Sequence, residues 1–93
     1  MSSGVHLGYI DASPAVESKI QEKHGITLAE VREALQFPAP VRIAPEEHPE
    51  HGYRWVAVGS CGGHVVIAWL LPLPEHEGAT ADSWTLKTAR WVS

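Results

Sequence analysis

The strongest constraint on the fold is a pair of adjacent glycines between two apolar segments. Residues 53–59 and 64–71 are rich in valine, isoleucine and tryptophan, and Ser60, Cys61, Gly62 and Gly63 separate them. β-Branched and aromatic residues favour strands, and a short connection containing glycine between two such segments is typical of a hairpin. The sequence therefore predicts two antiparallel strands, Tyr53–Gly59 and His64–Leu71, joined by a turn.

Signals for a helix lie near the start of the chain. Ser13 is a favourable N-cap, and proline is well tolerated in the first helical turn, where Pro14 stands. The spacing predicts a helix over Pro14–His24 with Val16 and Ile20 on its inner face. Gly25 is the expected left-handed residue that terminates it.

A second helix should follow almost at once. Thr27 and Glu30 have the spacing of a capping box, and Leu28, Val31 and Leu35 recur at intervals of three and four residues. Such a stripe faces a core. We expect the two helices to form a hairpin.

The remaining apolar segments predict three further strands. We place them at Val5–Ile10, Val41–Ala44 and Ser83–Trp91, with loops at Pro45–Gly52 and Pro72–Asp82. The chain length suits one domain, residues 1–93. The order of elements predicts an α+β fold, β-α-α-β-β-β with room for a further strand, in which the helical hairpin packs on a small antiparallel sheet.

The charge balance argues against a simple nucleic-acid-binding protein. Seven lysines and arginines face eleven acidic residues, for a net charge of -4, whereas a protein that grips nucleic acid alone normally has a basic footprint. Local fields nevertheless matter more than net charge for attracting a ligand. Much of the acidic charge falls in the two predicted loops, at Glu46, Glu47, Glu50, Glu75, Glu77 and Asp82.

The sequence also indicates a compartment. Cys61 is the only cysteine and has no partner for an internal disulfide, and residues 1–10 lack the pattern of a secretory leader. The longest apolar run, Val65–Leu71, is far shorter than the roughly 20 residues that cross a bilayer. We expect a cytoplasmic protein with no membrane association.

Four short motifs in order resemble one known family. Residues 22–31 read EKHGITLAEV and resemble the Lys-His-Gly-Val/Ile helix junction of BrnT-type toxins, which belong to the RelE-like toxin superfamily. Tyr53-Arg54 before Val58-Gly59, the apolar strand from Val65, and the closing Thr88-Ala89-Arg90 are similar to later motifs of that family. The resemblance covers about residues 11–91.

The resemblance implies an activity and partners. BrnT-like proteins are compact toxins of type II toxin-antitoxin pairs that cleave RNA without metal or cofactor, and a cognate DNA-binding antitoxin neutralises them. The chain would then have a RelE-like order of elements, act on RNA and assemble with its antitoxin.

Metal-free RNA cleavage requires a base for the 2′-hydroxyl, cations for the developing phosphate charge and an acid for the leaving oxygen. Lys23, His24, Arg54 and Arg90 are the candidate catalytic residues, and Lys19 is a candidate substrate-binding residue. Lys19 and Lys23 are four residues apart on one helical face, and both arginines alternate with core-facing apolar residues. The alternative is that these lysines and arginines are solvated surface charges, and that His24 is favoured at its helix end by the helix dipole.

Two other groups of residues have less support as sites. His48 and His51, with Glu47 and Glu50 beside them, lack the third protein ligand of a catalytic zinc site, so we predict no metal. Cys61 and His64 lack a third orienting group, so a thiol in a turn is the simpler interpretation.

The tryptophans leave two interpretations open. On strands beside valine and leucine they are usually core or interface residues, but single-strand nucleic-acid binders also stack bases on such rings. These residues are Trp55, Trp69, Trp84 and Trp91.

Two functions therefore stand as hypotheses. The first is an RNA-cleaving toxin in which Arg54 and Arg90 hold the phosphate, Lys23 stabilises charge and His24 transfers a proton. The second is a non-catalytic interaction domain with a toxin-like fold, whose acidic loops and tryptophan surface bind a protein partner.

Overall fold

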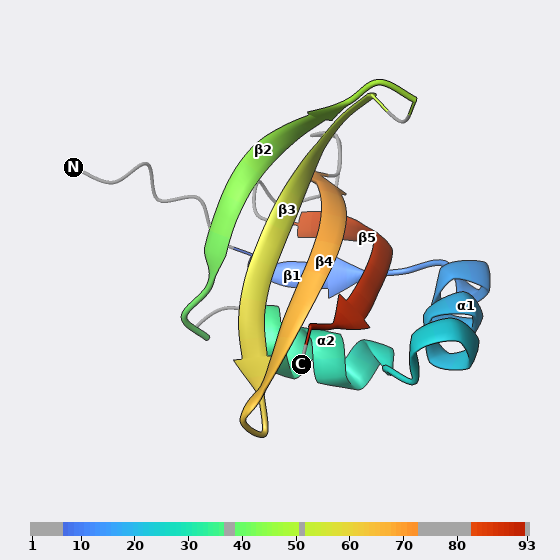
Figure 1. Cartoon of the computed structure of the whole chain (residues 1–93), viewed down its shortest axis with the longest axis vertical. Coiled ribbons are helices and arrows are strands. Elements are labelled where there is room, and N and C mark those ends of the chain that lie inside the picture. Colours follow the sequence, from blue (N-terminus) through green and yellow to red (C-terminus); the bar gives the residue numbers. More distant parts are fainter. Residues whose placement is uncertain (1–6, 37–38, 51, 73–82, 93) are drawn as a thin grey trace.

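The computed structural model describes residues 7–36, 39–50, 52–72 and 83–92. This part of the chain forms one strand, then two helices, then four strands (Figure 1). In chain order the elements are β1 (Tyr9–Asp11), α1 (Pro14–His24), α2 (Leu28–Leu35), β2 (Arg42–His48), β3 (Gly52–Cys61), β4 (His64–Pro72) and β5 (Ser83–Trp91).

The five strands form one sheet in the order β1-β5-β4-β3-β2. Strands β2 to β5 pair antiparallel, whereas β1 pairs parallel to β5. The predicted α+β class is confirmed, but the sheet is mixed where we expected it to be antiparallel throughout. A hairpin turn forces the two strands that it joins to be antiparallel, and no such turn connects β1 to β5, which lie at opposite ends of the chain.

The predicted central hairpin is confirmed. β3 and β4 pair from Trp55 with Leu70 to Cys61 with His64, which leaves only Gly62 and Gly63 between the strands. Their φ angles of 60° and 85° are those that a tight two-residue hairpin turn requires. Ser60 and Cys61, predicted in the turn, are the last residues of β3.

Both helices begin at the predicted caps, and α1 ends at the predicted Gly25. The Val16 amide donates to Ser13 Oγ at 3.2 Å, and Gly25 ends α1 with a φ of 64°. The Glu30 amide donates to Thr27 Oγ1, while the Glu30 carboxylate accepts from the Thr27 amide, which completes the capping box. Neither helix approaches the length and apolar character that crossing a bilayer demands.

Each helix makes its main contacts with the sheet and not with the other helix, so the two helices do not pack side by side as the expected hairpin. α2 packs on β3 and β4, and α1 packs on β5 (Figure 1). The predicted α2 stripe is buried: Leu28 is 7% exposed, and Val31 and Leu35 are fully buried. Ile20 is the buried residue of α1.

Two predicted strand boundaries are wrong. β1 covers Tyr9–Asp11, and the first residues of the predicted Val5–Ile10 strand lie outside the described residues. β2 continues to His48 through part of the predicted Pro45–Gly52 loop. β2 is an edge strand, where Pro45 can stand because proline there need not donate a ladder hydrogen bond. Positions 73–82 of the predicted Pro72–Asp82 loop are outside the described residues.

The sheet has one covered face and one open face. The inner face, under α2, includes the buried residues Ala57, Val66, Ala68, Leu70 and Ala89. Because side chains alternate along a strand, the intervening residues of β3 and β4 point to the opposite, outer face. These outer-face residues include Val56, Val58, Ile67, Trp69 and Leu71, all half-buried, and neither helix packs over the first four of them.

Two side chains in and just after α2 form hydrogen bonds with the backbone of the short strand β1. The Ile10 amide donates to Gln36 Oε1 at 3.2 Å, and Arg32 Nε donates to the Ile10 carbonyl at 2.8 Å. Arg32 also lies 3.7 Å from the Asp11 carboxylate and 5.2 Å from the centroid of the Tyr9 ring. These contacts hold β1 in place although only three residues pair with β5.

Gly59 is where α2 comes closest to β3. A Cβ atom at this position would clash with the Ala34 carbonyl oxygen and would lie 2.8 Å from Leu35 Cδ2. We expect Gly59→Ala to lower the free energy of unfolding by about 1 to 3 kcal/mol through overpacking. Urea denaturation measures it, with the exposed neighbour Ser60→Ala as control. Equal stability of both variants would contradict this close packing.

Leu35 is the fully buried end of the α2 stripe. We expect Leu35→Ala to cost about 2 to 4 kcal/mol, because the truncated side chain leaves a cavity under the sheet. The same denaturation series tests it, and an unchanged midpoint would show that Leu35 contributes nothing to the core.

Candidate functional site

A cationic cleft lies between α1 and the sheet. Its volume is about 520 Å³, and its lining residues are Lys19, Lys23, His24, Arg54, Leu71, Lys87 and Thr88. The chain's three lysines all line this cleft, although the net charge of the chain is -4. No acidic residue is among the seven, so the cleft suits an anionic ligand.

The short length of β1 makes room for α1 beside β5. β1 pairs only with Ser83–Thr85, so the second half of β5 has no strand neighbour on that side. α1 packs against β5, and Trp91 Nε1 donates to the Gly25 carbonyl at 3.3 Å. Lys19 and Lys23 flank the buried Ile20 in the helix, and both reach the cleft.

An irregularity in β5 brings a further lysine into the cleft. Trp69 pairs with Thr88 whereas the next residue of β4, Leu70, pairs with Leu86, so Lys87 is an extra residue opposite β4. A bulge of this kind redirects a side chain. Lys87 and Thr88 are consecutive and both line the cleft, which strict alternation would not allow.

Arg54 and Arg90 lie on the outer face on either side of Trp69. Arg54 precedes Trp55, which pairs with Leu70, and Arg90 pairs with Ile67, so the two arginines approach Trp69 from opposite directions along β4. Each guanidinium carbon lies 5.6 Å from the Trp69 ring centroid, within cation-π range.

A carboxylate completes this arrangement. Glu46 Oε1 accepts from Arg54 Nε and from Trp69 Nε1, each at 3.2 Å. The side chains of Arg54 and Glu46 are 18% and 41% exposed, so the pair is partly shielded from water.

The structure brings four of the five candidate site residues together. Lys19, Lys23, His24 and Arg54 line one cleft, and Arg90 is linked to it through the ring of Trp69. Sequence reasoning missed Lys87. The sequence did contain a signal of the bulge. The buried residues Leu86 and Ala89 are three positions apart, whereas residues on the same face of a regular strand are two positions apart.

Three of the four tryptophans belong to or pack against the core, and one lies on the outer face of the sheet. Trp84 is 4% exposed in the core, and Trp55 and Trp91 pack against that core. Trp69 alone of the four lies on the outer face between the arginines.

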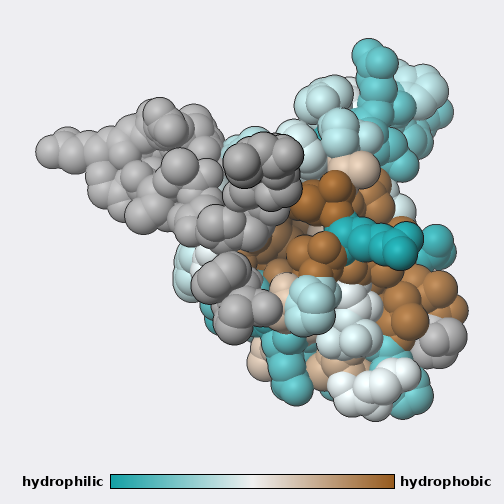
Figure 2. All heavy atoms as spheres, turned by 90° about the vertical axis from the view of Figure 1, so that its left-hand side faces the viewer, coloured by the Kyte–Doolittle hydropathy of each residue, from teal (hydrophilic) through white to brown (hydrophobic). Residues whose placement is uncertain are grey.

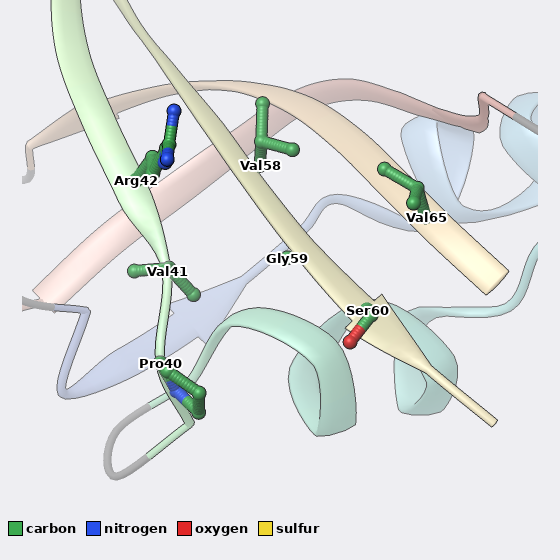
Figure 3. A pocket seen from close by; sticks show the side chains of 7 residues that line it. All are labelled: Pro40, Val41, Arg42, Val58, Gly59, Ser60 and Val65. Carbon is green, nitrogen blue, oxygen red and sulfur yellow. The ribbon is translucent and has the colours of Figure 1, made fainter. Parts of the chain in front are cut away.

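A second, shallower groove lies at the N-terminal end of β2. Its volume is about 310 Å³, and it is lined by Pro40, Val41, Arg42, Val58, Gly59, Ser60 and Val65 (Figure 3). Seen from the β2 side, hydrophobic side chains gather around a band of hydrophilic ones (Figure 2). Arg42 is the only cationic residue among the described residues that line the groove, which therefore has less positive charge than the cleft.

The weaker candidate sites gain no support. Among the described residues, no three His, Cys, Asp or Glu side chains are grouped to hold a metal, and His51 lies outside that set. Desolvation, followed by the nearby Glu33 and Glu30 carboxylates, raises the pKa of the Cys61 thiol. A raised pKa disfavours the reactive thiolate.

Comparison with protein-family models gives no match, and comparison with curated proteins gives none either.

The cleft should bind polyanions with a marked salt dependence. For single-stranded nucleic acid the slope of log K against log salt is about -0.7 per phosphate contact. We expect Lys87→Gln to weaken binding of a fluorescent single-stranded oligonucleotide and to reduce this slope by about 0.7. Fluorescence anisotropy at several salt concentrations measures it, with Arg42→Gln as the control outside the cleft. Equal slopes for the two variants would contradict the cleft as the binding site.

Proposed function

We propose that the protein is a metal-independent endoribonuclease acting as the toxin of a type II toxin-antitoxin pair. The observation that carries the proposal is the cleft in which Lys19, Lys23, His24, Arg54 and Lys87 meet without a carboxylate among the lining residues. The motif resemblance to BrnT-type toxins supports the same activity.

The residue types of the cleft match the needs of phosphodiester cleavage. Arg54 would bind the scissile phosphate, and the lysines would stabilise the charge that develops on it. Histidine is the residue type that most often serves as a general acid or base, so His24 would transfer the proton. Arg90, beyond Trp69, would hold the phosphate of an adjacent nucleotide.

The donor set of the cleft favours a reaction without a metal ion. Mg²⁺ is normally held through carboxylates, and none is among the described residues that line the cleft. Cationic side chains instead offer direct neutralisation of the phosphate.

The proposed activity implies two partners. The substrate is RNA, and the neutralising partner is a cognate DNA-binding antitoxin, with both proteins acting in the cytoplasm. No cofactor takes part in the proposed reaction.

A second candidate function follows from the outer face of the sheet. Val56, Val58 and Ile67 are half-buried there, and neither helix packs over them. Such an apolar surface is typical of an interaction site, so a non-catalytic domain that binds a protein partner is the alternative.

Purified protein incubated with total RNA in EDTA tests the enzyme. We expect cleavage to persist in EDTA, and Arg54→Ala or His24→Ala to slow it by about 10²-fold, as loss of one preorganised electrostatic contact or proton-transfer group does. Arg42→Ala, an arginine outside the cleft, should cleave at the wild-type rate, and circular dichroism checks that each variant is folded.

The outcomes separate the two functions. Absence of cleavage by the wild type, together with tight binding of a partner, would refute the nuclease and support the interaction domain. Cleavage abolished by EDTA would contradict the metal-independent chemistry. Wild-type rates in the Arg54 and His24 variants would place the active site elsewhere.

A further inference from the structure

We infer that Glu46 is a positioning residue, which holds Arg54 so that the terminal nitrogens of its guanidinium are presented to an anion in the cleft. This inference rests on the proposed function for the identity of the anion, and on the observed contacts for the role of Glu46.

One carboxylate oxygen organises two neighbouring side chains. Glu46 lies opposite Arg54 in the β2–β3 register, and its Oε1 accepts from Arg54 Nε at 3.2 Å. The same oxygen accepts from Trp69 Nε1 at 3.2 Å, across one intervening strand. The ring of Trp69 in turn lies 5.6 Å from the Arg54 guanidinium carbon. Glu46 therefore fixes both Arg54 and the ring against which Arg54 packs.

The contact with Glu46 uses only one edge of the guanidinium. The recorded bond is from Nε, and no described residue accepts from Nη1 or Nη2. These two terminal nitrogens form the pair that binds a phosphate in a bidentate manner. An arginine held at Nε loses less side-chain entropy when it binds its ligand.

Arg90 provides an internal comparison. It packs on the same ring at the same distance, but no described carboxylate forms an ion pair with it. Arg90 is exposed, whereas the Arg54 side chain is only 18% exposed. The carboxylate thus distinguishes a fixed arginine in the cleft wall from a less constrained one beside it.

If Glu46 positions Arg54, its removal should change the strength of anion binding in the direction opposite to that expected from charge alone. Removing a negative charge next to a cationic cleft should strengthen anion binding if charge alone matters. If Glu46 positions Arg54, Glu46→Ala should instead weaken binding. Glu46→Gln keeps an oxygen that can accept from Arg54 Nε and removes the charge, so it should bind at least as tightly as the wild type.

The first measurement is independent of any RNA activity. In ¹⁵N-¹H correlation spectra we expect a separate, exchange-protected Nε–H signal for Arg54, assigned by its loss in Arg54→Ala. This signal should persist in Glu46→Gln and lose its protection in Glu46→Ala. Protection that is unchanged in Glu46→Ala, or absent from the wild type, would overturn the inference whether or not the protein cleaves RNA.

The second measurement tests the consequence for the ligand. The probe is a fluorescent single-stranded RNA with 2′-O-methyl groups, which cannot be cleaved through its 2′-hydroxyls. We expect Glu46→Ala to weaken its binding by about 2- to 10-fold, the range for ordering one flexible side chain. Glu47→Ala removes the same charge from the next residue of β2, and there we expect unchanged or slightly tighter binding.

The results distinguish the inference from the proposed function. Tighter binding by Glu46→Ala would overturn the positioning role. A protected Arg54 signal that depends on Glu46 would establish positioning even if the wild type bound no RNA, and that lack of binding would refute the proposed function alone.

Discussion

The close packing of α2 against β3 at Gly59 is the contact on which the rest of the arrangement depends. A side chain there would meet the Ala34 carbonyl and Leu35, so only glycine lets the helix lie this near the sheet. The approach buries the apolar stripe of α2 on the inner face, where the core residues of β3, β4 and β5 collect. α2 leaves the outer face uncovered, and this face carries Arg54, Trp69 and Arg90.

The positive charges of the lysines gather in one place on this fold. The chain as a whole is acidic, yet all its lysines reach one cleft, because α1 presents two of them and the β5 bulge presents the third. Net charge was therefore a poor guide to the local field, which depends on which charges lie close together. Glu46 forms a hydrogen bond with the lining residue Arg54 but is not itself among the residues that line the cleft.

Local sequence signals predicted the parts of the fold that local chemistry decides. The Gly62-Gly63 turn, the Ser13 and Thr27 caps and the terminator Gly25 specify their own backbone geometry, and each element that they bound was predicted from the sequence. The parallel pairing of β1 with β5 and the extension of β2 through Pro45 depend on distant neighbours. Neither pairing has a signal within its own segment.

The candidate site was predictable to the same extent. Side-chain alternation placed Arg54 and Arg90 on the face away from the core, and the helical period placed Lys19 and Lys23 together. The bulge at Lys87 and the bridge from Glu46 to Trp69 needed the strand register, which one sequence does not contain.

Because Glu46, Arg54, Trp69 and Arg90 form one connected group, their contributions to binding should not be additive. Loss of Trp69 would remove a packing surface from both arginines and a donor from Glu46, so one substitution would disturb several contacts at once. Both proposed functions would use the outer face of the sheet. A protein partner seated on Val56, Val58 and Trp69 would cover the side chains that position Arg54, so partner binding and access of RNA to this wall of the cleft would compete for one surface.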